Sequence, residues 1–524
     1  MLSTVVALIA LLLYSWNFDG SAALAFGLLD RFGIDRISQR VLGLNDVPMN
    51  ESILAESGEW DPMHHMGGNS PWFPKYAGTV QEGLDLPQGC RVDQVHMISR
   101  HAERYPTVLA GVRMLELYQH LQKANMTFSG DLSLVNDWNF FMRNPAQRFE
   151  NLVATGAYAG TLEAFATGVK LKSRYEHLLD DALARKQTTF WASGSKRVIE
   201  TAKYFGAGFF GVDWQDFADL QVIPETRKRR TSTLTPGKTC RKYGDNADGN
   251  GHDYGARMLY EWRSQYLPPI VARLQRENPG ISFTEAHVYS MQELCGFETI
   301  ALGSSPWCDV FTKEELESFE YARDLLHYYK AGPGNPYSGA MGMLWLNATA
   351  NLLKEGPEKA GSLFLSFVHD GDITPMLSAL ELFPQSIDLP TTHILRNRTW
   401  KTSDVIPMGG RIIFERLACA APQYCWDNAE FGYPNHKYCT PPAEEDHVRI
   451  NVNDGIVALP GCEDGPGRSC PLETFMGRGS GFLIFTLLGR WSHTTLAAGW
   501  HGTLAGRHPP IEERGGVQGP LFWA

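Results

Sequence analysis

The sequence predicts an α/β fold, in which the strands of a sheet alternate with helices. The main observation is a pattern that occurs three times: a short apolar stretch typical of a strand, a polar loop, and a helical periodicity. The chain has 524 residues, 43% of them hydrophobic and 20% charged, which is typical of a globular protein. This length suits one large α/β domain with a smaller inserted domain, and it also suits three separate domains. The composition excludes general disorder, a collagen-like fibre and a polytopic membrane protein.

The first of the three units starts with the strand predicted for Val92 to Ser99. The heptapeptide Arg100-His101-Ala102-Glu103-Arg104-Tyr105-Pro106 follows it directly. A helical pattern then places Val108, Val112 and Leu115 on one face. An Arg-His-x-x-Arg cluster is therefore expected between the end of a strand and the start of a helix.

The second and third units have the same order. Thr188 to Ala192 is a short strand candidate, and Ser193-Gly194-Ser195-Lys196-Arg197 follows it before a helical stripe. Leu363 to Val368 is a continuous apolar run, typical of a buried central strand, and it ends in His369-Asp370-Gly371-Asp372. Thr374-Pro375 then predicts the start of another helix.

The polar residues of these three loops are expected to converge. In open α/β sheets, ligands bind beyond the carboxyl ends of the strands, where helix N-termini favour anions. Guanidinium groups can hold the oxygens of one phosphate in a bidentate manner, which Lys does less well. The predicted anion site, which needs no metal, consists of Arg100, Arg104, Arg197, His101, His369 and Asp370. Each motif alone would more often be a surface patch or a capping pair, and the site prediction rests on their joint occurrence.

The net charge argues for a localised site. The chain has 47 basic and 58 acidic side chains, which makes −11 with His neutral. An acidic protein is a poor candidate for binding nucleic acid or an anionic membrane surface. An anionic substrate would therefore have to be bound where positive charge is concentrated.

The N-terminus predicts a secretory signal peptide over residues 1–25. Val5 to Tyr14 is mostly apolar, and Ala23-Leu24-Ala25 forms a small-residue cleavage pattern, although Lys and Arg are absent before it. The alternative interpretation is a buried N-terminal helix. No later segment has 18 consecutive apolar residues, so no transmembrane helix is expected. The predicted localisation is extracellular, either free or associated with a cell wall.

Nine cysteines are consistent with secretion. They form no C-x-x-C pair and no zinc pattern, so a disulfide framework is favoured over a metal site, and the odd number leaves at least one thiol without an intrachain partner. In a secreted chain the Asn-x-Ser/Thr sequons become candidate glycosylation sites. These sequons lie at Asn50, Asn125, Asn347 and Asn397.

The heptapeptide and the later motifs resemble those of the histidine acid phosphatase family, and most closely its secreted fungal acid phosphatase and phytase members. The family pattern R-H-G-x-R-x-P stands here as Arg100 to Pro106, and the family's His-Asp pair stands as His369-Asp370. Ser193 to Arg197 matches the intervening arginine motif. Similar stretches are Gly67 to Trp72 and Asn453-Asp454-Gly455, so that the resemblance covers roughly residues 67 to 475.

The resemblance implies a mixed, mostly parallel sheet flanked by helices, with a smaller inserted α-helical domain. The catalytic region would span 67–476. Its α/β core would comprise about 85–106, 186–215 and 285–476, and the insertions about 107–185 and 216–284. Residues 477–524 no longer resemble the family and are expected to form a divergent tail, or to reflect a misread frame.

The resemblance also implies roles for the site residues. His101 would be the nucleophile that forms a phosphohistidine, and Asp370 would protonate the leaving alkoxide. Arg100, Arg104, Arg197 and His369 would bind the phosphate. The implied function is a phosphoric monoester hydrolase without cofactor or metal, acting on a small-molecule phosphate monoester, with phytate as one candidate. The oligomeric state is left open.

The sequence departs from the family pattern at several positions. Ala102 replaces the usual Gly, which would cost activity if that position needed a positive φ or close backbone approach to phosphate. Gly371 follows His-Asp where a polar residue is frequent, and the family's partner for Cys240 is absent. The disulfides implied by the resemblance are Cys90–Cys419, Cys295–Cys308, Cys425–Cys439 and Cys462–Cys470.

Two alternatives remain open at this point. A phosphoglycerate-mutase-type enzyme shares the Arg-His core, although the leader and the cysteine-rich end argue against it. A catalytically impaired, secreted relative that only binds phosphate esters would also fit, and Ala102 is the best argument for it.

Overall fold

The computed structural model describes residues 60–81, 83–184, 188–226, 232–421, 425–427, 437–439 and 443–477. The chain divides into two compact units, residues 1–61 and 62–524, and all that follows concerns the second. The predicted signal peptide, Asn50, the side chains of Cys425 and Cys439, and the tail from residue 478 lie outside the described residues.

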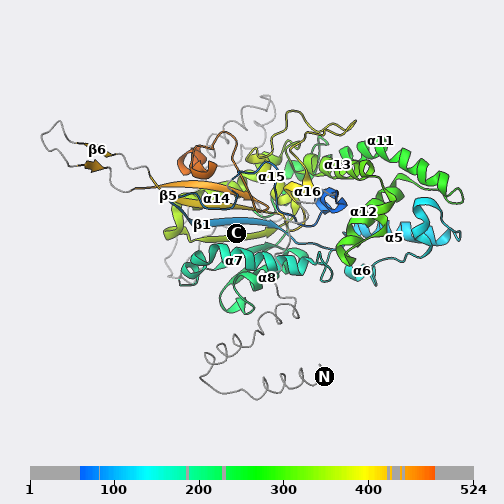
Figure 1. Ribbon diagram of the computed structural model, residues 1–524, viewed down its shortest axis with the longest axis horizontal. Coiled ribbons are helices and arrows are strands. Elements are labelled where there is room, and N and C mark those ends of the chain that lie inside the picture. Colours follow the sequence, from blue (N-terminus) through cyan, green and yellow to red (C-terminus); the bar gives the residue numbers. More distant parts are fainter. Residues whose placement is uncertain are drawn as a thin grey trace, which may run out of the picture. The chain divides into compact units, whose positions relative to one another are not determined.

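A mixed sheet forms the centre of this unit, which confirms the predicted fold class (Figure 1). In the described residues its strand order is β10-β8-β5-β1-β4-β2-β3, and β9 pairs with β8. β1, β4, β2, β3 and β8 run in one direction, whereas β5, β9 and β10 run in the other. The strands are β1 (Cys90–Arg100), β2 (Thr189–Ser193), β3 (Asp219–Ile223), β4 (Leu363–Val368), β5 (Arg411–Ala420), β8 (Glu444–Val452), β9 (Gly455–Val457) and β10 (Cys470–Pro471), with β6 (Cys425–Asp427) and β7 (Lys437–Cys439) in a separate pair.

Helices cover both faces of the sheet (Figure 1). On one face α7 (Gly160–Ala184) and α8 (Lys196–Phe209) bury their apolar residues against alternate residues of β1, among them Val95 and Met97. On the other face Trp345 of α14 (Ser338–Ala360) packs on Phe414 of β5, with ring centroids 5.4 Å apart. α15 (Asp370–Ala379) also contacts β1. All six residues of β4 are buried, as expected for a central strand covered on both faces.

A group of helices packs together beside the sheet. Its long members contact one another in the pairs α11–α13, α11–α12 and α12–α5. These long helices are α5 (Val108–Lys123), α11 (Tyr254–Glu277), α12 (Glu285–Leu302) and α13 (Lys313–Lys330). Elsewhere the described chain has the short helices α6 (Pro145–Arg148), α9 (Pro236–Thr239), α10 (Arg241–Asp245) and α16 (Thr402–Val405). No helix in the described part of the chain is both long and apolar enough to cross a bilayer.

The boundaries of the predicted insertion differ from this arrangement. Residues 107–185 and 216–284 were expected to form it, but α7 packs on the sheet and β3 belongs to the sheet. Conversely, α12 and α13, which were assigned to the core, pack with α11. An amphipathic sequence shows that a helix has a buried face, but it does not show whether a sheet or another helix covers that face.

The helices after β1 and β4 differ in detail from the sequence patterns. The helix expected after Pro106 is present as α5, but Val108 and Val112 are exposed and its buried face contains Met114 and Leu117. The helix after β4 begins at Asp370 rather than at Thr374, because the side chain of Asp372 accepts a hydrogen bond from the backbone N–H of His369 and caps the first turn (3.2 Å).

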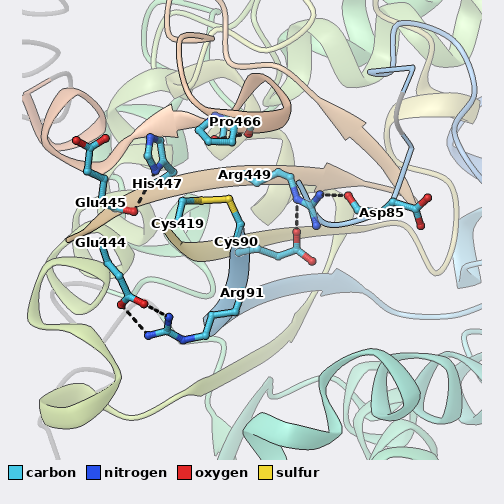
Figure 2. The surroundings of a disulfide bond; sticks show 11 residues. Asp85, Cys90, Arg91, Cys419, Glu444, Glu445, His447, Arg449 and Pro466 are labelled. Carbon is cyan, nitrogen blue, oxygen red and sulfur yellow. Dashed lines mark hydrogen bonds and ion pairs between the residues drawn. A yellow bond between two sulfur atoms is a disulfide. The ribbon is translucent and has the colours of Figure 1, made fainter. Parts of the chain in front are cut away.

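The disulfides of the described residues join the pairs that the resemblance implied. Cys90–Cys419 links the first residue of β1 to β5, where the two cysteines are directly opposite in the antiparallel register (Figure 2). Cys295–Cys308 and Cys462–Cys470 are also formed, and Cys240 has a free thiol. In the β6–β7 pair Cys425 is opposite Cys439. The sequon residues Asn125, Asn347 and Asn397 are exposed.

Candidate active site

Three parallel strands bring the predicted site residues to one edge of the sheet. β1 lies beside β4, and β4 lies beside β2, so the segments after all three strands leave the sheet at the same edge. The backbone N–H of His101 donates to the carbonyl of Val368 (3.0 Å), which joins the loop after β1 to the end of β4. Sequence segments almost 270 residues apart thus meet here because of the strand order.

Arg100 is buried at the end of β1, with a side chain 1% exposed. Its Nη1 donates to the carbonyls of Gly68 (2.6 Å) and Ile406 (2.8 Å), and its Nη2 pairs with Oδ2 of Asp370 (2.8 Å). A planar guanidinium can make all three contacts, whereas an ammonium group has no such fixed geometry. A Cβ at Gly68 would lie 2.6 Å from Nε2 of His327, so a larger residue here would displace that ring or the Gly68 backbone.

His101 is buried and is held in one tautomer. Its Nδ1 lies 2.9 Å from the carbonyl oxygen of Ala102. Because a carbonyl oxygen only accepts, Nδ1 must carry the proton, and the lone pair of a neutral ring is on Nε2. Burial, together with the charges of Arg100 and Arg197, holds the pKa of His101 well below its usual range. The ring is therefore a free base with a nucleophilic nitrogen.

The other two arginines add positive charge beside this ring. Arg104 donates to the carbonyl of Tyr105 (3.0 Å), and burial plus the neighbouring arginines lowers its pKa to about 9. Arg197 lies in the first turn of α8, where Nη2 donates to Nδ1 of His369 (3.3 Å) and Nη1 lies 3.5 Å from Oε2 of Glu150. Such a density of guanidinium groups favours binding of an anion.

His369 and Asp370 complete the group at the start of α15. The rings of His101 and His369 are in an edge-to-face arrangement with centroids 5.6 Å apart, and Nε2 of His369 lies 2.9 Å from Oε1 of Glu225. Burial alone would raise the pKa of Asp370, but Arg100 and then His327 outweigh it and hold that pKa well below its usual range. Asp370 is consequently a carboxylate before substrate binds.

The two departures from the family motif are sterically harmless in this structure. The backbone of Ala102 does not have a positive φ, and its methyl group packs with Leu152 and Ala164. Its N–H donates to Oγ1 of Thr201 (3.1 Å). Ala102 therefore does not cost activity through a strained, positive φ. A Cβ added to Gly371 would contact nothing within 4 Å.

Three further residues near the site were missed from the sequence. Arg323 and His327 lie on α13 and interact electrostatically with Arg100 and Asp370, and Glu225 follows β3. The spacing of Arg323 and His327 places them on one face of a helix, but nothing in that pattern connects them to loops elsewhere in the chain. They could be found only once α13 was seen to pack beside the sheet edge.

Comparison with known proteins identifies the family of this chain. Residues 91–453 match the family model of the histidine phosphatase superfamily, branch 2. A phytase of Candida albicans is 32% identical over 80% of this chain and 84% of its own length, and an acid phosphatase of Komagataella pastoris is 30% identical over 84% and 87%.

A solved phytase structure has the same fold as this chain. The crystal structure of the phytase from D. castellii superimposes with a TM-score of 0.71 at 29% identity, covering 81% of this chain and 86% of that one. The predicted class, a phosphate monoester hydrolase, is thereby confirmed. This chain belongs to branch 2 of the histidine phosphatase superfamily.

Proposed function

We propose that this protein is a secreted acid phosphatase that transfers the phosphoryl group of a phosphate monoester to Nε2 of His101 and then to water, without a metal. The observation that carries the proposal is the neutral His101 ring, which has its proton fixed on Nδ1 and lies among three arginines. A buried imidazole with a free lone pair is a nucleophile, and the surrounding guanidinium groups can stabilise a phosphoryl transition state.

In the first step Nε2 of His101 forms a bond to phosphorus while the bond from phosphorus to the ester oxygen breaks. Arg100, Arg104 and Arg197 bind the non-bridging oxygens, whose charge they stabilise as the transition state forms. The ester oxygen leaves with the bond's electron pair and takes a proton from Asp370. The first product is therefore an alcohol, and the phosphoryl group remains on His101.

Asp370 must gain that proton, since it is a carboxylate in the free enzyme. A bound phosphate offsets the charge of Arg100, and this removes part of the interaction that keeps Asp370 ionised. The second pKa of a phosphate monoester is about 6, so in acid the substrate arrives as a monoanion that carries the required proton. This coupling favours an acidic pH optimum.

In the second step water attacks the phosphohistidine. The Asp370 carboxylate accepts a proton from the water, the bond between phosphorus and Nε2 breaks, and inorganic phosphate is released. Asp370 lies beside Arg100 at the same sheet edge as His101, which supports both roles for this carboxyl.

Secretion is part of the proposal. It is supported by the disulfides Cys90–Cys419, Cys295–Cys308 and Cys462–Cys470, and by exposed sequon residues. Recovery of the protein from culture medium, with a mass that falls after endoglycosidase treatment, is the expected result.

Rapid-quench labelling tests the chemistry. A ³²P-labelled monoester should give an acid-labile, base-stable label on the wild-type protein and none on His101→Ala. Asp370→Asn should slow esters with poor leaving groups much more than p-nitrophenyl phosphate, whose leaving group needs little protonation. Absence of label on an active wild-type enzyme would refute the phosphohistidine, and equal losses on both substrates would refute the acid role of Asp370.

Substrate range is best tested with a panel that includes phytate, across pH and with a chelator present. We infer a broad phosphomonoesterase, with phytate as one substrate candidate. Glu103, which lies within the heptapeptide, need not repel an anionic substrate, because burial raises its pKa to about 8 and its Oε1 accepts from the N–H of Trp72 (2.8 Å). Hydrolysis that requires added metal would contradict the proposed mechanism.

A further inference from the structure

We propose that Glu225 is a positioning residue of the phosphate site, which fixes the tautomer and orientation of His369 and, through that ring, the guanidinium of Arg197. This inference rests on the proposed function, since it assigns His369 and Arg197 to phosphate binding. Neither the strand-end motifs nor their spacing pointed to Glu225.

The fold brings Glu225 to the site through the edge strand. β3 lies parallel to β2, so the residues after β3 leave the sheet at the same edge as Ser193 to Arg197. Gly194 makes the close approach feasible, since a Cβ there would lie 3.3 Å from Cα of Pro224 and 3.4 Å from the backbone nitrogen of Glu225. The glycine of the arginine motif thus allows the two loops to pack against each other.

The hydrogen bonds define the protonation of the His369 ring. Arg197 Nη2 can only donate, so Nδ1 of His369 is the acceptor in their 3.3 Å contact. A neutral ring then carries its proton on Nε2, which donates to Oε1 of Glu225 (2.9 Å). Asp372 holds the backbone of the same residue by accepting from its N–H (3.2 Å). The ring of His369 therefore contacts the Glu225 carboxylate, and its backbone N–H donates to a second carboxyl group, that of Asp372.

Glu225 remains an acceptor in acid. Burial alone would raise the pKa of Glu225, but the hydrogen bond from His369, together with smaller contributions from Ser193 and Lys238, outweighs this and lowers that pKa to about 2. The side chains of His369 and Glu225 are 18% and 22% exposed, so this contact is shielded from water more than a surface pair. The charged and titratable groups around the pair are Arg197 of α8, Lys238 of α9, Asp370 and Asp372 of α15, and His101.

Loss of the Glu225 acceptor would act on two phosphate ligands at once. Without it the Nε2–H of His369 has no partner, and the ring can rotate or change tautomer. Either change removes the acceptor that orients Arg197. Misplacement of a reacting or binding group by about 1 Å can cost roughly 100-fold in rate.

The test compares Glu225→Ala with Glu225→Gln. Glutamine keeps an oxygen that can accept the Nε2–H, so it should rescue the enzyme to within a few-fold of wild type. Alanine should lower kcat/KM for p-nitrophenyl phosphate by about 10- to 100-fold, and it should raise the inhibition constant of inorganic phosphate. The matched control is Glu444→Ala, because Glu444 pairs with Arg91 at the far end of β1 (Figure 2) and should leave both parameters unchanged.

Thermal unfolding of every variant shows whether it is folded. If Glu225→Ala is destabilised, Glu225→Met replaces it, since methionine fills similar space without an oxygen acceptor. Activity of Glu225→Ala equal to wild type would overturn the inference, as would a glutamine variant as impaired as the folded alanine variant.

The two proposals fail in different ways. If wild-type enzyme forms no phosphohistidine, the proposed function is wrong whatever the Glu225 variants do. If wild type is labelled on His101 and folded Glu225→Ala is labelled at the same rate, the assignment of Glu225 alone is wrong.

Discussion

His96 provides a quantitative test of how acid acts on this fold. It lies in the middle of β1, 1% exposed, and its ring stacks on Phe364 with centroids 4.4 Å apart. Both ring nitrogens are buried without a hydrogen-bond partner in the described structure. Burial lowers the pKa of His96 to about 3, so the ring stays neutral in the folded state down to about pH 3.

The sign of the effect follows from the two states. In the unfolded chain a histidine binds a proton below about pH 6.5, whereas folded His96 does so only below about pH 3. Between these values the unfolded state binds one more proton, so each pH unit of acidification costs about 1.4 kcal/mol of folding free energy. At pH 4.5, two units below 6.5, the cost is about 2.7 kcal/mol.

The perturbation is His96→Phe, which keeps a flat ring against Phe364 and removes the titration. The free energy of unfolding is measured in urea at pH 7.5 and pH 4.5. The value for the variant minus that for wild type should be about 2.7 kcal/mol larger at pH 4.5 than at pH 7.5. Any constant packing cost of the larger ring cancels in this difference. Phe364→Leu is the control, because it disturbs the same contact without removing a titratable group. If the difference in unfolding free energy between wild type and His96→Phe is the same at both pH values, His96 does not contribute to the acid sensitivity of the fold.

Two further predictions concern the loops that hold the site. Gly68→Ala should lower kcat/KM at least about 10-fold, since the new Cβ would lie 2.6 Å from His327 and displace either that ring or the carbonyl that holds Arg100; steady-state kinetics on p-nitrophenyl phosphate with a thermal-unfolding check would show it, and unchanged kinetics would contradict it. Ala102→Gly should leave kcat/KM within about twofold, because the backbone there does not need glycine; a large gain in activity would instead support the alternative of a catalytically impaired relative.

Much of the fold could be predicted because its signals are local. The apolar run of β4, the strand before Arg100 and the helix after Ser195 depend on residues that are neighbours in the chain. Packing partners are not local, and this explains the errors. The helical pattern of α5 identified a helix, but it did not show that Val108 and Val112 are exposed, and it did not show that α7 contacts the sheet. The start of α15 depended on Asp372 capping His369, a hydrogen bond that overrode the Thr-Pro signal.

The residues that could carry out the chemistry can be identified from contiguous motifs at strand ends, which contain His101, Asp370 and the arginines. Their chemical state depends on contacts that form only in the folded protein. The carbonyl of Ala102 selects the tautomer of His101, Arg100 keeps Asp370 ionised, and Glu225 reaches His369 from a loop that no motif marks. Tautomer, charge and orientation depend on atoms a few ångströms away in space, and strand pairing brings those atoms from distant parts of the chain.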